Sequence, residues 1–340
     1  MKAFFIEEIG KTCVKETAVP TPREDEVLIK VMAVGLCGTD AHLYLGDYEN
    51  PYPVIPGHEF SGIVEAVGAE VKNFKPGQHV AADPNIYCEA CDHCKQNRQN
   101  YCLDYKGLGN QVPGAFAQYI AIPERCVYDI GDLDFTTASM IEPLACVLHG
   151  HDRARPGFGD RVLILGAGAI GLLHLQVCKN DGARLVAVAD IKEEPLRLAK
   201  ELGADAVLLN DHTMKEQVEA AAKGGFDLII DCTGVPKVIE QAVPLMADEG
   251  RLLFFGVCPQ DAGISVNPYE IYQRELTFIG SNSLKKTFYS AMLELKSGRV
   301  KVSKMIGDKI LLDELPRQIQ AFAEKKTKLK TVVYPNGFVG

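Results

Sequence analysis

Two hydrophobic patterns divide the chain into parts of different texture. Up to about residue 130, apolar residues come in short runs with partial alternation, as in Glu26–Gly35, 62–67 and 77–82, and glycine or proline separates the runs. Partial alternation with β-branched residues and frequent turn residues is typical of short strands. This part therefore predicts an all-β, barrel-like domain.

From residue 160 onward, apolar runs alternate with segments of helical spacing. Strands and helices in this order predict an α/β domain with a doubly wound parallel sheet of six strands. The strands are expected at 161–165, 185–189, 206–208, 227–231, 251–255 and 276–280, and the helices at 172–178, 194–202, 214–223 and 238–246.

The last part of the chain is not needed to complete that sheet. It predicts helices at 285–296 and 312–324 and a strand at 330–334, and we expect it to return to the first domain. A further helix is expected at 135–153, capped by Thr136 or Thr137. The expected domains are 1–152, with a lobe at about 85–105, then 153–284, and a returning segment at 285–340.

Length and charge narrow the classes of function. A chain of 340 residues is expected to form two domains. The net charge of −9 argues against nucleic acid and anionic membranes as partners. No apolar run approaches the ~20 residues that cross a bilayer, and the start of the chain lacks the apolar core of an export signal. Eleven cysteines without such a signal suit a reducing compartment, so we predict a cytoplasmic protein.

Four cysteines lie within fifteen residues: Cys88, Cys91, Cys94 and Cys102. Four thiolates can close the tetrahedral shell of a structural zinc ion, and the spacing differs from those typical of iron–sulfur clusters. The surrounding segment is polar and needs such a staple to become ordered. We therefore predict a structural zinc site.

Three further positions carry metal-binding chemistry, but each has an ordinary structural explanation. The glycines Gly35 and Gly38 on either side of Cys37 suggest a turn, and Cys37 could be a small buried thiol. His58 and Glu59 follow a Pro-Gly turn and could be a hydrogen-bonded imidazole and a solvated acid. Glu142 precedes a proline in a helical run and could be a first-turn acid. Taken singly, none of them decides between structure and catalysis.

The first strand of the α/β part ends in a glycine-rich turn. Gly166, Gly168 and Gly171 form a GxGxxG pattern with Ala169 and Ile170 between the last two glycines, and a helix follows. The glycines let the main chain approach a pyrophosphate at the helix N-terminus. Asp190 ends the next strand, where it can accept hydrogen bonds from the ribose hydroxyls and repel a 2′-phosphate. The cofactor is therefore expected to be NAD.

Together these motifs resemble the zinc-containing medium-chain dehydrogenase family over nearly the whole chain. The resemblance implies a GroES-like β-barrel catalytic domain, a Rossmann cofactor domain and a catalytic zinc in the cleft between them. It also implies two zinc ions per chain and a homodimer or homotetramer. Within the family, Glu142 in place of a cysteine is similar to the polyol and threonine dehydrogenases, and the sorbitol type is most similar.

The resemblance also implies roles for single residues. Cys37, His58 and Glu59 are expected to bind the catalytic zinc, which keeps an open position for water or substrate. Glu142 is expected to bind the metal or to hold that water. Thr39 and His42 are expected to relay the proton to solvent, and Asp40 to be structural.

The sequence departs from sorbitol dehydrogenases where those enzymes contact the polyol. Leu43 replaces a tyrosine, and 281–283 replaces an Arg-Tyr pair. The alcohol is therefore open, and Lys285 and Lys286 either favour a phosphorylated substrate or form a solvated helix start. An L-threonine 3-dehydrogenase-like enzyme is one alternative. A zinc- and NAD-binding regulatory protein without turnover is another.

Overall fold

The computed structural model describes residues 1–47, 50–324 and 329–338. The chain forms two compact units, one of residues 1–143, 288–296 and 302–340, the other of residues 144–287 and 297–301. The chain passes from the first unit to the second after residue 143, whereas the expected domain limit was after residue 152. It returns to the first unit after residue 287, whereas the expected limit was after residue 284. We call the first the catalytic unit and the second the nucleotide unit.

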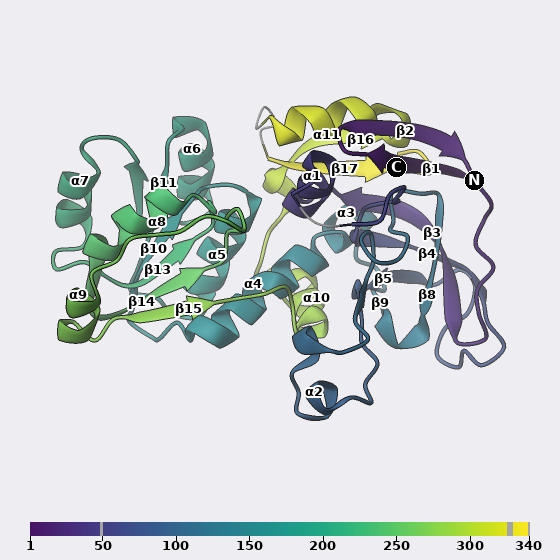
Figure 1. Cartoon of the computed structure of the whole chain (residues 1–340), viewed down its shortest axis with the longest axis horizontal. Coiled ribbons are helices and arrows are strands. Elements are labelled where there is room, and N and C mark those ends of the chain that lie inside the picture. The colour runs from purple at the N-terminus through teal and green to yellow at the C-terminus, as the bar shows by residue number, and fades with distance from the viewer. Residues whose placement is uncertain (48–49, 325–328, 339–340) are drawn as a thin grey trace. The chain divides into compact units, whose positions relative to one another are not determined.

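A seven-stranded sheet organises the catalytic unit (Figure 1). Its strands lie in the order β16-β17-β3-β4-β5-β9, and β8 pairs with the other end of β3. Only β16 and β17 run parallel. The bounds are β3 (Glu26–Gly35), β4 (Glu59–Val67), β5 (His79–Ala82), β8 (Tyr119–Pro123), β9 (Val127–Asp129), β16 (Ile306–Leu311) and β17 (Lys330–Tyr334).

Two small ribbons and several short helices complete this unit. The ribbons pair β1 (Lys2–Glu8) with β2 (Lys11–Glu16) and β6 (Asn85–Ile86) with β7 (Lys106–Gly107). The helices are α1 (Gly38–Leu45), α2 (Asp92–Lys95), α3 (Phe135–Ala138), α10 (Phe288–Lys296) and α11 (Leu315–Ala323), with 3-10 turns η1 (Gln99–Tyr101), η2 (Glu124–Cys126), η4 (Ser303–Met305) and η5 (Leu312–Glu314). The core includes Phe4, Phe60 and Phe116, together with side chains from the end of the chain such as Ile319 and Val333. Residues from the last part of the chain therefore contribute to this core.

The nucleotide unit is built on a parallel sheet of six strands (Figure 1). The order β12-β11-β10-β13-β14-β15 is that of a doubly wound dinucleotide fold. The strands are β10 (Arg161–Leu165), β11 (Leu185–Asp190), β12 (Ala206–Leu209), β13 (Phe226–Asp231), β14 (Met246–Phe254) and β15 (Thr277–Gly280). The helical segments are α4 (Ile141–Ala154, which starts in the catalytic unit), α5 (Ala169–Asn180), α6 (Glu193–Glu201), α7 (Met214–Ala221), α8 (Pro236–Ala242), η3 (Val243–Leu245) and α9 (Pro268–Gln273).

Both faces of this sheet are covered, which explains the unbroken apolar runs of its strands. Leu163 and Ile229 pack on one face with Val218 of α7 and Ile239 of α8. Their neighbours along the strands, such as Ile164, are fully buried as well. Parallel strands with helices on both faces lack the polar side of an amphipathic strand. The six-stranded fold predicted from these runs is confirmed.

Two local predictions were wrong, and one strand was not predicted. The helix expected at 135–153 is two helices, α3 and α4, and Asp134 caps the first by accepting a hydrogen bond from the Thr137 N–H. The segment after Cys37 was expected to be a turn but forms α1. Strand β16 was not predicted, because its apolar positions are few and it is stabilised by pairing with β17.

Two findings bear on the predicted environment of the protein. Within the described ranges, no helix has the length and apolar character that a membrane crossing requires. All eleven cysteines lie in those ranges, and none of them forms a disulfide bond.

Candidate metal and cofactor sites

Cys37 lies where strand β3 gives way to helix α1. It is the N-cap residue of α1 with extended backbone angles (φ −108°, ψ 158°). The side chain of Asp40, three residues later, accepts a hydrogen bond from the Cys37 N–H at 2.8 Å. This hydrogen bond caps the N-terminus of α1 and fixes its first turn. It fixes the backbone of Cys37, and the Cys37 thiol lies 3.7 Å from the Thr39 hydroxyl.

His58 follows a short segment, residues 55–57, that leads into β4 and is held by main-chain hydrogen bonds to residues 114–116. Gly57 has a φ of +94°, and a Cβ there would lie 2.9 Å from the Phe116 ring, so the position requires glycine. The Gly57 carbonyl accepts a hydrogen bond from the Ala115 N–H at 2.8 Å. A turn was predicted at Pro56 and Gly57, but the structure has neither a turn nor a bend at residues 55–58; main-chain hydrogen bonds to residues 114–116 hold this segment instead.

Asp40 joins the segment that contains Cys37 to the segment that precedes His58. Besides the Cys37 N–H, its carboxylate accepts a hydrogen bond from the Gly57 N–H at 3.1 Å, and Oδ1 lies 3.8 Å from His58 Nδ1. Asp40 is fully buried, and burial raises its pKa, although His58 and the two N–H groups oppose that shift. Because both hydrogen bonds come from main-chain N–H groups, Asp40 sets the spacing of the two segments whatever their side chains bind.

The two segments joined by Asp40 bring three potential ligands together. Cys37 Sγ, a His58 ring nitrogen and a Glu59 carboxylate oxygen all lie within 4.8 Å of one another. Thiolate, imidazole and carboxylate are the donors that zinc accepts, and three of them leave a fourth position open in a tetrahedral site. The arrangement therefore fits a catalytic zinc ion, with Cys37, His58 and Glu59 as the residues that would hold it.

The charges around His58 agree with a cation site. Burial alone would lower the pKa of His58, but Cys37, Asp40 and Glu142 outweigh burial and hold that pKa well above its usual value. A pocket of acidic groups that favours a proton on His58 also favours a metal cation, which displaces that proton when it binds.

Glu59 has a second partner that sequence analysis missed. Its Oε2 forms a buried ion pair with the Lys330 ammonium at the start of β17, and both side chains are more than nine-tenths buried. Burial would lower the pKa of Lys330, but Glu59 and Cys37 outweigh burial and raise it, so the lysine stays charged. A buried carboxylate is stable only when such a partner compensates its charge.

Gly35 makes room for this ion pair. In the sheet it pairs with Glu59 on β4 and with Val332 on β17. A Cβ at Gly35 would overlap Glu59 Oε2 and lie 2.7 Å from Lys330 Cε. The sequence predicted Gly35 as the last residue of a strand but gave it no role in the site. The structure shows that it ends β3 and is required by the close approach of two side chains.

Glu142 lies close to this cluster but outside the three-residue set. It is 6% exposed in the first turn of α4, and its charge helps to raise the pKa values of His58 and Lys330. The structure therefore brings Glu142 near the ligands without placing it among them.

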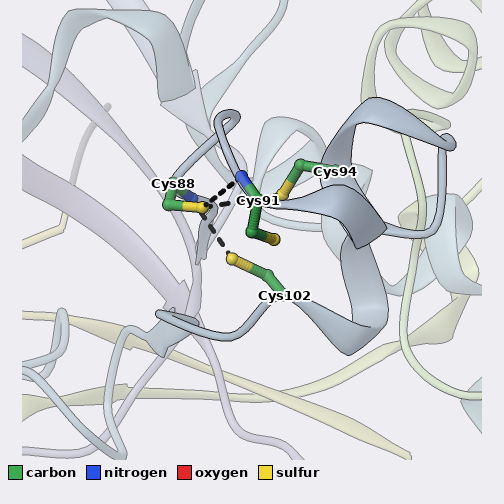
Figure 2. Close-up of side chains that lie close together, drawn as sticks. All are labelled: Cys88, Cys91, Cys94 and Cys102. Atoms are coloured by element: carbon green, nitrogen blue, oxygen red, sulfur yellow. Dashed lines mark hydrogen bonds between the residues drawn. The ribbon is translucent and has the colours of Figure 1, made fainter.

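The second predicted zinc site is local in sequence. The thiols of Cys88, Cys91, Cys94 and Cys102 lie within 4.8 Å of one another, and Figure 2 shows the four side chains gathered around a common centre. Cys88 Sγ is 3.9 Å from Cys94 Sγ and accepts a hydrogen bond from the Cys91 N–H at 3.3 Å. Hydrogen bonds from main-chain N–H groups lower the pKa of Cys91 to about 6, whereas burial raises that of Cys94 to about 12. Four thiols at this spacing fit a closed structural zinc shell.

The glycine-rich turn of the nucleotide unit has the geometry of a phosphate cradle. Gly166 has a φ of +99°, and a Cβ on Gly171 would clash with the Gly166 carbonyl. Gly168 is the N-cap of α5, so the N–H groups of Ala169 and Ile170 begin the helix. Asp190 accepts hydrogen bonds from the Ala167 N–H at 2.8 Å and the Lys192 N–H at 2.9 Å. A carboxylate has further lone pairs for ribose hydroxyls. These residues fit a dinucleotide.

Comparison with known proteins agrees with this class of metal- and nucleotide-binding oxidoreductase. Residues 23–132 match the family model of the alcohol dehydrogenase GroES-like domain, and residues 169–297 match that of the zinc-binding dehydrogenases. D-altritol 5-dehydrogenase of Agrobacterium fabrum is 35% identical over 320 residues, which are 93% of this chain and 94% of the relative. D-arabitol-phosphate dehydrogenase of Enterococcus avium is 35% identical over 310 residues, 88% of this chain and 87% of the relative.

A solved structure shows the same fold. A zinc-binding dehydrogenase from Sinorhizobium meliloti 1021, bound to NADP, superposes with a TM-score of 0.92 at 35% identity, over 98% of this chain and 99% of that one. The fold and the sites define a zinc-binding, nucleotide-dependent dehydrogenase. The chain belongs to the zinc-containing medium-chain alcohol dehydrogenase family, which confirms the predicted resemblance and fold class.

Proposed function

We propose that the protein is an NAD-dependent zinc dehydrogenase that oxidises a polyol or another secondary alcohol, possessing two zinc ions per chain. The observation that carries the proposal is the cluster of Cys37, His58 and Glu59, whose spacing is set by Asp40 independently of any ligand. A structural or regulatory protein has no need of a three-donor site with an open position. The relatives that act on altritol and on arabitol phosphate support the class of substrate.

The chemistry divides between the metal and the side chains around it. A bound zinc ion lowers the pKa of an alcohol hydroxyl at the open position, as it does for bound water. Cys37, His58 and Glu59 hold the metal, Lys330 balances the Glu59 charge, and Glu142 binds the metal or holds its water. A bound nicotinamide would supply the hydride acceptor, and Thr39 and His42 would carry the hydroxyl proton to solvent.

The first experiment measures metal content and substrate range together. We expect two zinc ions per chain, one of which is readily removed with loss of activity. A screen of NAD reduction with polyols, polyol phosphates and L-threonine should find a polyol or its phosphate as the best substrate. A preference for L-threonine would favour the threonine dehydrogenase alternative, and one tightly held zinc without turnover would favour a regulatory protein.

The identity of the cofactor rests on Asp190. A carboxylate at this place repels the 2′-phosphate of NADP, and we propose NAD although the Sinorhizobium protein holds NADP. The ratio of kcat/KM for NAD over NADP should be on the order of 100, since close like charges cost a few kcal/mol. Asp190→Ser should reduce this ratio strongly. Equal use of both cofactors by the natural protein would refute the assignment.

The anionic-substrate alternative rests on Lys285 and Lys286. Lys285 is half-buried and Lys286 is exposed, and the loop that carries them is tied to α4 by a hydrogen bond of 2.6 Å from the Thr287 hydroxyl to the Ala145 carbonyl. If the substrate is a polyol phosphate, Lys285→Gln should raise KM for the phosphate and leave KM for the free polyol unchanged.

We further propose a homodimer or homotetramer in the cytoplasm. Strand β15 lies at an edge of the nucleotide sheet, and Tyr269 and Tyr272 of the neighbouring α9 are exposed. An open strand edge is a site where a second chain can pair. Eleven cysteines, none of which forms a disulfide bond, suit a reducing compartment. Light scattering of the purified protein measures the assembly.

A further inference from the structure

The end of helix α1 folds back over the helix. Gly46 has a φ of +80°, and the N–H groups of Gly46 and Asp47 both donate to the His42 carbonyl. This left-handed glycine cap is a common way to end a helix. The Tyr52 hydroxyl donates to the Leu43 carbonyl at 2.6 Å, so the last turn is also held from outside. The fold-back directs the side chain of Asp47 toward the imidazole of His42.

The two side chains form a short hydrogen bond. Asp47 Oδ2 lies 2.7 Å from His42 Nδ1, and the side chains are 50% and 33% exposed, respectively. An ionised carboxylate can only accept, so Nδ1 must carry the hydrogen. In a neutral imidazole, Nε2 is then the atom that accepts a proton. Because both side chains are partly exposed, the pair contributes little to stability. Its consequence is that it determines which ring nitrogen of His42 carries the hydrogen.

His42 also lies on the side of the helix that leads to the metal ligands. Thr39 and His42 are three residues apart in α1 and therefore share a face. The Thr39 hydroxyl is 3.7 Å from Cys37 Sγ. A ligand thiol, a hydroxyl and an imidazole thus follow one another along the first two turns, and Asp47 adds a carboxylate at the outer end.

We propose that Asp47 is a positioning residue of the proton relay, which holds His42 in the Nδ1–H tautomer so that Nε2 receives the proton. When the alcohol loses its hydride to NAD⁺, its hydroxyl proton goes to the Thr39 oxygen. Thr39 passes its own proton to His42 Nε2, and the imidazolium, stabilised by Asp47, releases one proton to water. The inference rests on the proposed function, since only dehydrogenation gives His42 a proton to carry.

A double-mutant cycle tests the coupling. For the best substrate found in the screen, Asp47→Asn should lower kcat about tenfold with KM unchanged, a part of the roughly 100-fold contribution of a general base. In a His42→Ala background the same change should have no further effect. Asp47→Glu should restore most of the rate. Glu8→Gln, which breaks the exposed Lys11–Glu8 pair, is the matched control and should leave kcat unchanged. Additive losses in the double variant would overturn the proposal.

A second measurement does not depend on turnover. The ¹⁵N chemical shifts of histidine-labelled zinc-loaded protein report which ring nitrogen carries the hydrogen. His42 should show the Nδ1–H form in the natural protein and a mixture of tautomers in Asp47→Asn. Unchanged shifts would refute the role of Asp47. If no variant oxidises any alcohol, the proposed function fails, and the tautomer shifts still decide what Asp47 does.

Discussion

The two candidate metal sites of the catalytic unit differ in how the chain assembles them. The four thiols lie within fifteen residues, in a lobe whose apolar cluster consists of Tyr87, Tyr105 and the cysteines themselves. The Cys37 cluster instead combines the end of β3, the start of β4 and, through Lys330, the last strand β17. We expect the lobe to depend on a bound metal for its order, whereas the Cys37 cluster is held by Asp40 and by the sheet. Structural and catalytic sites can therefore be distinguished by what remains when the metal is removed.

The largest expected effect is the loss of order in the lobe when its zinc site is removed. Structural zinc contributes roughly 10–16 kcal/mol to the order of small metal-bound peptides. Cys94→Ser should remove one zinc ion per chain and abolish hydrogen-exchange protection of the amides at 88–102. Cys258→Ser, in the nucleotide unit, is the control and should keep both metal ions. Retention of zinc and of protection in Cys94→Ser would refute the four-thiol site.

The next effect is on catalysis without a comparable change in fold. Cys37→Ala should lower kcat by on the order of 10³-fold, since the metal supplies several kcal/mol of transition-state stabilisation. Its Tm should stay within a few degrees of the natural protein, because Asp40 bonds the main chain of Cys37 rather than the thiol. Cys13→Ala, in the β1–β2 hairpin, is the matched control. A collapse of Tm in Cys37→Ala would show that this site also depends on its metal for folding.

A third change tests the close packing around Glu59. Gly35→Ala should cost about 1–3 kcal/mol of unfolding free energy, as overpacking of a core does, and should weaken zinc binding at the Cys37 cluster while sparing the lobe. Gly263→Ala, where a Cβ meets nothing within 4 Å and φ is not positive, is the control. Denaturant unfolding with metal analysis measures both effects. A neutral Gly35→Ala would mean that Glu59 and Lys330 can move apart.

The smallest expected effect is a change in stability caused by Asp83, which lies just before the lobe in the sequence. Burial raises the pKa of Asp83 to about 6, and Asp83 accepts two hydrogen bonds from Asn85, which in turn accepts one from Tyr105. The folded state therefore binds the Asp83 proton more tightly than the unfolded state does, so stability falls as the pH rises from about 4 to about 6. Asp83→Asn keeps an acceptor for Asn85 and removes the charge.

We expect Asp83→Asn to raise the unfolding free energy at pH 7.5 by about 2 kcal/mol and to flatten its slope between pH 4 and 6. Guanidinium unfolding at several pH values measures this. Asp132→Asn is an exposed control in the same unit. A lower stability of Asp83→Asn at pH 7.5 would show that the ionised carboxylate is needed.

The same contrast explains what could be predicted from the sequence. The four cysteines and the glycine-rich turn were recognised because their spacing is local and their chemistry depends on few neighbours. Cys37, His58 and Glu59 were linked only through a family resemblance, since nothing along the chain shows that the two segments meet. Lys330 and Gly35 were missed as functional residues, because a lysine at the start of a strand and a glycine before a turn are common. Their roles depend on the pairing of β17 and β4 with β3, which is a property of the folded sheet.

The buried carboxylate of Asp40 has a practical consequence. Because it ties two loops together through their main-chain amides, the ligand positions form a socket that exists before the metal arrives. Loss of the metal would then inactivate the protein reversibly without unfolding it, and activity would depend on the concentration of available metal. The same property would allow exchange of zinc for cobalt, whose visible absorption would report directly on what occupies the open position.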